Sequence, residues 1–358
     1  MPRFKGSPKF AHDGAERIGV LLVNSGTPDS PRTSDIRRFL AGLLGDRRVV
    51  EVPRAIWLPI LHGIILRTRP YRTARKYRKI WSDAGSPMRR ISDALAANVR
   101  ARLARRVLAP VSIELGMLYS SPSVASGLER LAAQGAQRLL VLPLFPQYCG
   151  VTTGAVHDQV ARELSRWRWL PEQRFVNEYH DHPEYIDAWR ERIAAHWQGH
   201  GRTRHLLLSF HGIPQAYFRR GDPYFCKCQK TARLLADALQ LEDEQWSLCF
   251  QSRYGPGNWL QPYTDTVLGE LPRRGVRSVT VACPGFAVDC LESLEEIALD
   301  GRERFISAGG TEFQYVPALN DTDRHAALLA GLIETHCGGW VSNAGLRAGN
   351  AVREPGTT

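Results

Sequence analysis

A histidine in a short turn is the residue of this sequence that is best suited to chemistry. His211 lies in the segment Ser-Phe-His-Gly-Ile-Pro at residues 209–214, after the apolar run Leu-Leu-Leu at residues 206–208. The run predicts a buried strand, and Gly212 and Pro214 predict the turn that ends it. An imidazole at the carboxyl end of a buried strand stands where parallel sheets present ligands and catalytic groups, although most strand-end histidines are structural.

A row of acidic residues follows a second strand and turn. Asp289, Glu292 and Glu296 come after the apolar run at residues 279–282 and the Cys-Pro-Gly turn at residues 283–285. At helical spacing these three carboxylates fall on one face, and apolar residues fall on another. Asp289 and Glu292 also have the three-residue spacing of a capping box, which needs no function, but capping leaves Glu296 unexplained.

Together the histidine and the acids predict proton transfer and a passing metal ion. A neutral imidazole accepts a proton, and His211, Glu292, Asp289 and Glu296 are of the types that hold a divalent ion briefly. A permanent site would need three or four convergent, tightly spaced ligands. The Cys-Lys-Cys segment at residues 226–228 lacks the two-residue spacing of the common zinc and redox motifs, so no dedicated metal site is expected there.

Aromatic and amide side chains surround these elements. Gln251, Ser252 and Trp259 lie in a segment rich in flat side chains and hydrogen-bonding groups, residues 250–264. Tyr119 and Tyr148 lie in the corresponding turns of the first half of the chain. Aromatic residues near a cleft suit a large planar apolar ligand, whereas the ordinary place of an aromatic residue is the core.

The elements that must hold these residues alternate between strands and helices. Apolar runs that end in Gly or Pro turns and lead into amphipathic stretches recur at residues 18–24, 113–118, 139–144, 206–210, 246–250 and 279–282. This alternation predicts an α/β fold with parallel sheets covered on both faces. Neither a dinucleotide loop nor a phosphate loop is present, which disfavours a nicotinamide or ATP enzyme.

The chain also contains a weak internal repeat. Residues 21–28 resemble residues 207–214 in their apolar lead and Gly-x-Pro ending, which places His211 where Ser25 stands in the first half. Residues 135–143 match residues 275–284 in the same way, as a helix end that leads into a buried strand and a proline turn. Two similar halves that join near residues 198–204 fit these two matches. The first half is longer, and we expect its extra segment, from about residue 37 to residue 90, to serve the ligand or a membrane.

The positive charge is partly concentrated in that extra segment. The chain of 358 residues carries a formal charge of +11, and residues 67–79 hold seven basic residues and no acid. Such a block predicts an anionic neighbour (phospholipid headgroups, nucleic acid or a carboxylate-bearing ligand) or else a solvated helix face. The apolar stretch before it, residues 56–66, is too short to cross a bilayer, so it is either an interfacial contact or a core helix. We find no signal peptide or spanning helix in the sequence.

At these residues the sequence resembles the ferrochelatase family, enzymes that insert ferrous iron into a porphyrin. The matching segments are residues 209–214 with 221–224, residues 250–253 with Trp259, and residues 283–297, and weaker similarity extends from about residue 19 to about residue 332. The resemblance implies two Rossmann-like domains, which we place at residues 15–198 and 199–332. It also implies a porphyrin cleft between them and a peripheral membrane contact near its mouth. We expect the polar tail, residues 333–358, to be partly disordered.

The resemblance assigns roles to single residues. His211 matches the family's active-site histidine, Glu292 matches its essential carboxylate, and Asp289 and Glu296 match acidic positions attributed to proton or metal conduction. The substrate-binding residues that we predict are Tyr119, Tyr148, Gln251, Ser252, Trp259 and Ser25. Two positions depart from the family pattern, because Ser25 replaces a larger apolar residue and Leu118 stands where some relatives carry an arginine.

The function expected from the resemblance is insertion of ferrous iron into protoporphyrin IX, by distortion of the macrocycle and removal of its pyrrole protons. Iron is then a substrate, no cofactor is permanently bound, and no iron-sulfur cluster is expected, because Cys337 is the only cysteine beyond Cys290. We expect a cytoplasmic protein in peripheral contact with the inner face of the membrane, and no nucleic-acid partner. The alternatives are a chelatase for coproporphyrin, another tetrapyrrole or another metal, and a non-catalytic porphyrin or haem carrier.

Overall fold

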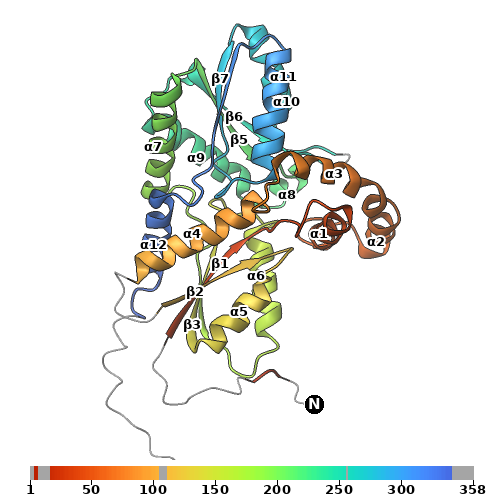
Figure 1. The fold of residues 1–358 in the computed structure, drawn as a ribbon, viewed down its shortest axis with the longest axis vertical. Helices are drawn as coiled ribbons and strands as arrows, with labels where there is room; N and C mark the ends of the chain where they lie inside the picture. The colour runs from red at the N-terminus through yellow and green to blue at the C-terminus, as the bar shows by residue number, and fades with distance from the viewer. Residues whose placement is uncertain (1–3, 7–16, 105–110, 255–256, 341–358) are drawn as a thin grey trace, which may run out of the picture.

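Two parallel sheets, one in each half of the chain, form the framework of the protein (Figure 1). The structure is a computed structural model that describes residues 4–6, 17–104, 111–254 and 257–340. The first sheet has the strand order β2-β1-β3-β4 and the second has the order β6-β5-β7-β8, so the same order is repeated. All the strand pairs are parallel. The predicted α/β fold is confirmed, and the sequence repeat corresponds to a repeat of structure.

The first half holds four strands and the helices between them. Its strands are β1 (Arg17–Asn24), β2 (Val111–Met117), β3 (Ala136–Pro143) and β4 (Glu172–Phe175), and its helices are α1 (Thr33–Gly45), α2 (Arg54–Ile60), the π-helix η1 (Leu61–Ile65), α3 (Leu66–Ile80), α4 (Pro87–Leu103), α5 (Val124–Ala133) and α6 (Thr153–Leu164).

The second half repeats this pattern after a long helix. Its strands are β5 (His205–His211), β6 (Trp246–Gln251), β7 (Ser278–Ala282) and β8 (Glu312–Val316). Its helices are α7 (Pro183–His200), α8 (Gln215–Arg219), α9 (Tyr224–Ala238), α10 (Thr264–Glu270), the π-helix η4 (Glu292–Gly301), α11 (Arg302–Ser307) and α12 (Asp323–His336), with short 3₁₀ turns η2 (Asp243–Gln245) and η3 (Pro272–Arg274).

The central strands are apolar on both faces because both faces are covered. Val20 and Leu22 of β1 belong to the same buried cluster as Leu206 and Leu208 of β5, so one core runs through both sheets. Leu21, between the first pair, belongs to a second cluster on the opposite face of the first sheet, beneath α5 and α6. A strand buried on both sides reads as a continuous apolar run, and for this reason the inner strands β1, β3, β5 and β7 were predictable. The edge strands β2 and β6 were predictable too, because their last residues are buried.

The two strands that the sequence did not predict are β4 and β8, each at the edge of its sheet. Their sequences, Glu-Gln-Arg-Phe and Glu-Phe-Gln-Tyr-Val, carry polar residues. The other two edge strands, β2 and β6, end in buried residues, whereas β4 has no buried residue and β8 has only two. No apolar run therefore marks β4 or β8.

The helix that joins the two halves packs on the second half, and the last helix of the chain packs on the first. The helix α7, which precedes the second sheet, packs against α9 and β8, and the last helix, α12, packs back against α4 and β3 of the first half (Figure 1). Of the residues that we assigned to the tail, 333–336 form the end of α12, and the turn that follows at 337–340 buries Trp340 at 3% exposure. The rest of the predicted disordered tail, residues 341–358, lies outside the described residues. The proposed domain limits themselves stay a prediction.

The extra segment of the first half forms a helical arm at the side of the molecule, made of α1, α2, η1 and α3 (Figure 1). The arm has its own small core, to which Ile36, Leu40, Leu61 and Leu66 contribute. The corresponding connection in the second half, between β5 and β6, holds only α8, α9 and one short turn. Across the described residues, no helix combines the length and the apolar character needed to span a bilayer.

Candidate active site

His211 is the last residue of β5, and its ring is held in one tautomer. Nδ1 lies 2.7 Å from the carbonyl oxygen of Gly212, which accepts but never donates, so Nδ1 carries the hydrogen in the neutral ring. Nε2 then presents a lone pair that accepts a proton. Gly212 is required in this turn because a Cβ there would lie 2.9 Å from the carbonyl oxygen of Gln251.

The acidic residues Glu292 and Glu296 lie on η4, which follows β7. Since β5 and β7 are neighbours in the sheet, their carboxyl ends bring His211 and η4 to the same edge. The charge of His211 lowers the pKa of Glu296 and the charge of Glu292 raises it, so both groups lie near that carboxyl. The pairing of histidine and acids expected from the sequence is thus present in three dimensions.

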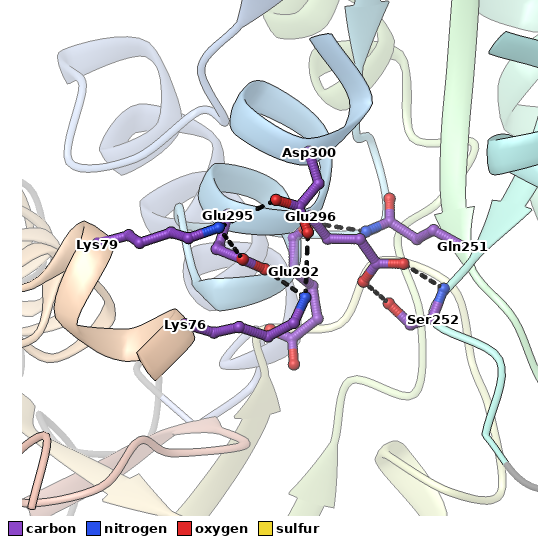
Figure 2. A network of polar contacts seen from close by, with 8 residues as sticks. All are labelled: Lys76, Lys79, Gln251, Ser252, Glu292, Glu295, Glu296 and Asp300. Carbon is purple, nitrogen blue, oxygen red and sulfur yellow. Dashed lines mark hydrogen bonds and ion pairs between the residues drawn. The ribbon is translucent and has the colours of Figure 1, made fainter. Parts of the chain in front are cut away.

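Residues at the end of β6 fix the two acids in place (Figure 2). The backbone N–H of Ser252 donates to Oε1 of Glu296 at 2.7 Å, and the Ser252 hydroxyl donates to Oε2. Nε2 of Gln251 donates to the backbone carbonyl of Glu292 at 2.7 Å. Burial raises the pKa of Glu296 above its usual value, against the hydrogen bonds from Ser252 and the charge of His211. A carboxyl group whose pKa is raised by burial holds its proton more firmly than an exposed glutamate does, as a group that exchanges protons with a substrate can require.

Asp289 lies apart from this row, in a buried polar cluster. It is 4% exposed, and Oδ1 accepts hydrogen bonds from Ser293 Oγ at 2.9 Å, Tyr315 OH at 2.5 Å and the backbone of Ala318 at 3.3 Å. Oδ2 accepts from Nδ2 of Asn320 at 2.7 Å. The predicted common face for Asp289, Glu292 and Glu296 is wrong, because Asp289 precedes the helix. The capping box is not formed either, since η4 has no side-chain cap.

Aromatic rings adjoin the imidazole. The ring centroid of His211 lies 6.3 Å from that of Tyr254 and 6.5 Å from that of Phe286, and Tyr254 meets Trp259 edge to face at 6.1 Å. The guanidinium of Arg69, on α3, lies 4.2 Å above the Tyr254 ring. The predicted residue Trp259 is therefore in this wall. Tyr254, Phe286 and Arg69 were not among the predicted site residues.

A buried tyrosine of the arm lies within electrostatic range of Glu292. Burial, and then the nearby charge of Glu292, raise the pKa of Tyr77 well above its usual value. Tyr77 lies on the buried face of α3 with Pro70 and Ala74. The helical spacing of these residues signals burial, but nothing in the sequence relates α3 to a helix more than 200 residues away.

Three of the predicted substrate-binding residues lie in the first half and are engaged there. The Tyr119 hydroxyl donates to Asp46 at 3.0 Å, and Ser25 Oγ contacts the sulfur of Met88 at 3.8 Å. Tyr148 lines a separate cavity of about 230 Å³ with Asp222. Within the described part of the chain, none of the three has a hydrogen bond or ring contact with His211 or with the acids of η4.

The basic block was expected to face an anionic neighbour, and part of it faces carboxylates of the protein itself. Lys76 and Lys79 form ion pairs with Glu295 and Asp300 on η4 (Figure 2). These two lysines therefore have carboxylate partners within the protein, although their side chains stay 44% and 49% exposed. Among the residues that the structure describes, no group of three His, Cys, Asp or Glu side chains is arranged to hold a metal ion.

Comparisons with known proteins agree on one family. The sequence model of the family described as Ferrochelatase matches residues 17–337. A protein of Nitrosococcus oceani named Ferrochelatase is 51% identical over 346 residues, which cover 97% of this chain and 94% of that protein. A protein of Thioalkalivibrio sulfidiphilus with the same name is 49% identical over 338 residues, 94% of this chain and 92% of that protein.

Solved structures of similar fold include a chelatase. SirB from Bacillus subtilis with Fe3+ superposes with a TM-score of 0.54, at 13% sequence identity, and covers 92% of this chain and 98% of that one. The sirohydrochlorin chelatase SirB from Bacillus subtilis subspecies spizizenii in complex with cobalt gives a TM-score of 0.52 at 14% identity, with the same coverage. At these identities the likeness shows the fold alone.

Proposed function

This chain belongs to the ferrochelatase family, whose members insert a metal ion into a porphyrin, and we propose that its own reaction converts protoporphyrin IX and ferrous iron to protohaem. The observation that carries the proposal is an imidazole whose Nδ1 bonds the Gly212 carbonyl and leaves Nε2 available, at the same sheet edge as two glutamates of which one has a raised pKa. A carrier would need the aromatic rings but not this acid–base pair.

In the proposed mechanism, His211 and the acids divide the proton transfers. Insertion of a divalent metal displaces two pyrrole protons, and Nε2 of His211 accepts one from the face of the ring that it meets. Glu292 and Glu296 remove the second proton or assist the incoming ion, and Ser252 keeps Glu296 oriented. Because only two of these acids lie together, the ion passes through rather than residing there.

Distortion of the macrocycle is the proposed source of rate acceleration. A flat porphyrin hides its nitrogen lone pairs from an approaching ion, whereas a bent one exposes them. Rings packed against the macrocycle, with Trp259 and Tyr254 as candidates, would favour the bent form and so bring the bound substrate closer to the transition state. We keep Tyr119, Tyr148 and Ser25 as predicted contacts of the porphyrin periphery only.

Two substitutions test the assigned roles. We expect His211→Ala to abolish iron insertion in an anaerobic assay that follows the loss of porphyrin fluorescence, while porphyrin binding remains. Glu292→Gln should lose activity with an unchanged melting temperature. Near-wild-type turnover of His211→Ala would refute the role of the imidazole. Parallel assays with coproporphyrin, and with cobalt in place of iron, decide which substrate pair the enzyme prefers.

We also propose that the arm contacts the membrane surface. Ile56 and Ile64 are 58% and 61% exposed, and Leu58 and Ile60 are exposed beside them. The cavity next to them, of about 440 Å³, is lined by Arg37, His62, Leu66, Arg67 and Tyr71. In the described part of the chain Arg67 has no carboxylate partner. Exposed apolar side chains next to unpaired basic groups suit an interface with anionic headgroups, and the cavity suits a headgroup phosphate.

Vesicle flotation tests this contact. Wild-type protein should float with vesicles that contain phosphatidylglycerol and much less with pure phosphatidylcholine. Ile56→Ser with Ile64→Ser, and separately Arg67→Gln, should reduce flotation, while Leu170→Ser removes an equally exposed apolar residue outside the arm and serves as control. Equal flotation of all variants would refute the contact. If free inorganic phosphate displaces the protein from vesicles, the cavity binds phosphate itself.

The prediction of no resident cofactor is kept as part of the proposal. All seven cysteines are free thiols, and only Cys226 is exposed. Protein purified without added iron should therefore show no visible absorbance from an iron-sulfur cluster. Acid-labile sulfide in stoichiometric amount would contradict this expectation.

A further inference from the structure

Two lysines of the arm form ion pairs with the helix that carries the active-site acids (Figure 2). Nζ of Lys76 lies 2.6 Å from Oε2 of Glu295 and 3.3 Å from Oδ2 of Asp300. Nζ of Lys79 lies 2.8 Å from Oε1 of Glu295 and 3.1 Å from Oδ1 of Asp300. Each carboxylate oxygen thus receives one lysine. We call these four residues the lysine clamp.

The buried member of the lysine clamp depends on its partners. The side chain of Glu295 is 1% exposed, whereas those of Lys76, Lys79 and Asp300 are 43–49% exposed. A carboxylate removed from water is stable only when it is paired and hydrogen-bonded. Hydrogen bonds to Glu295 and Asp300 raise the pKa of Lys79, so its ammonium remains charged throughout the physiological range.

The lysine clamp matches the unusual geometry of η4. Glu295 and Asp300 are five residues apart, and in an α-helix of 3.6 residues per turn such residues point roughly 140° apart. The i→i+5 bonding of a π-helix brings them toward the same side. Lys76 and Lys79 are three apart on α3 and are neighbours on one helical face. The two-by-two contact therefore fits the π form of η4, which spans 10 residues.

The same two helices carry residues at or beside the candidate active site. The helix η4 carries Glu292 and Glu296, which Gln251 and Ser252 hold from the other side. The helix α3 carries Arg69, which lies over the Tyr254 ring beside the active-site histidine. A change in the winding of η4 would rotate both glutamates relative to the histidine.

We propose that Lys76 and Lys79 are positioning residues for metal insertion, which keep η4 in its π-helical register and so fix Glu292 and Glu296 opposite His211. This inference rests on the proposed function. Neither lysine touches the reacting atoms. Both act through η4, because they stabilise its π-helical winding.

The test replaces the lysine clamp with apolar side chains of similar size, Lys76→Met, Lys79→Met and Glu295→Leu together. No unpaired charge is then buried, so the protein should fold with a melting temperature close to that of the wild type. We expect kcat to fall on the order of 10–100-fold, because displacement of a catalytic group by about 1 Å has effects of this size. The KM for porphyrin should stay near the wild-type value, and the pH profile of kcat should shift.

Two further variants separate positioning from stability. Lys76→Arg with Lys79→Arg keeps the cations and should restore most of kcat. Lys227→Met with Glu178→Leu removes another ion pair with a largely buried lysine, away from η4, and should leave kcat unchanged. Wild-type kcat and pH profile in the triple variant would overturn the inference. A wild-type protein that fails to insert iron would instead refute the proposed function on which it rests.

Discussion

Replacing Asp289 separates two explanations of this residue, a metal ligand and a structural tie. The structure gives Asp289 four hydrogen-bond donors, at 2.5–3.3 Å from its oxygens. Ser293 also donates to the backbone carbonyl of Cys290, so it keeps a partner when the carboxylate is removed. Tyr315 and Asn320 do not have an equivalent second acceptor among the described hydrogen bonds. Asp289→Ala therefore leaves two buried donors without a strong partner.

The expected loss in the free energy of unfolding follows from those two donors. A buried donor left unsatisfied costs roughly 1–3 kcal/mol, so Asp289→Ala should lower the free energy of unfolding by about 2–6 kcal/mol. Asp289→Asn keeps one acceptor oxygen and should lose about 1–3 kcal/mol, from the half of the site that then meets an amide N–H₂. Urea unfolding followed by circular dichroism measures both values. Asp83→Ala, at an exposed position, should change stability by less than about 0.5 kcal/mol.

Enzyme activity, measured at urea concentrations well below the midpoint of unfolding, completes the test. If Asp289 is a structural tie, Asp289→Asn keeps an unchanged KM for ferrous iron while its stability falls. If Asp289 is a metal ligand, the same variant keeps its stability and its KM for iron rises. A loss of less than about 1 kcal/mol in Asp289→Ala would refute the reasoning from hydrogen bonds, because large losses are the signature of a broken buried network.

Two more predictions concern the turn after the catalytic strand and the pH dependence of stability. Gly212→Ala places a Cβ 2.9 Å from the Gln251 carbonyl and 3.4 Å from Trp259, so it should destabilise the protein by about 1–3 kcal/mol and lower iron insertion, whereas Gly45→Ala, with open space around it, should do neither. Burial raises the pKa of Glu296 above its ordinary value of 4.5, so the folded protein holds a proton that the unfolded chain has released, and stability falls as pH rises through that window. Glu296→Gln should therefore raise the melting temperature at neutral pH, and this gain should shrink as the pH falls toward 4.5. A gain that is independent of pH would contradict the raised pKa.

The sequence predicted the strands that are apolar because they are buried. Strands with a buried stretch are apolar runs, and β1, β2, β3, β5, β6 and β7 were all found in this way. The strands β4 and β8 bury few residues, leave no such run and were missed. The repeated strand order could be anticipated from two short matches, since strands with the same place in each sheet meet the same demands for burial and for a turn.

The sequence also predicted which acid–base groups meet, because the topology of a parallel sheet decides it. A residue that ends one strand and a helix that follows its neighbour must share an edge, and this brings His211 to Glu292 and Glu296. Asp289 was misplaced because helical periodicity was extended back across a turn. The turn directs Asp289 into a cluster with Tyr315 and Asn320, residues of a later strand and loop.

The sequence by itself determined the fold class, the family and the sheet edge that carries the candidate site, since apolar runs, turn residues and short motifs are local properties of the chain. Only the tertiary structure decided which distant residues contact the helix at that edge and how that helix is wound. Lys76 and Glu295 are 219 positions apart, and a basic block reads the same whether it faces lipid, solvent or a buried carboxylate. The winding of η4 as a π-helix is likewise not written in its residues, because an α-helix suits them equally well. The packing of α3 against η4 selects both the partners and the register, and packing between distant segments has no local signature.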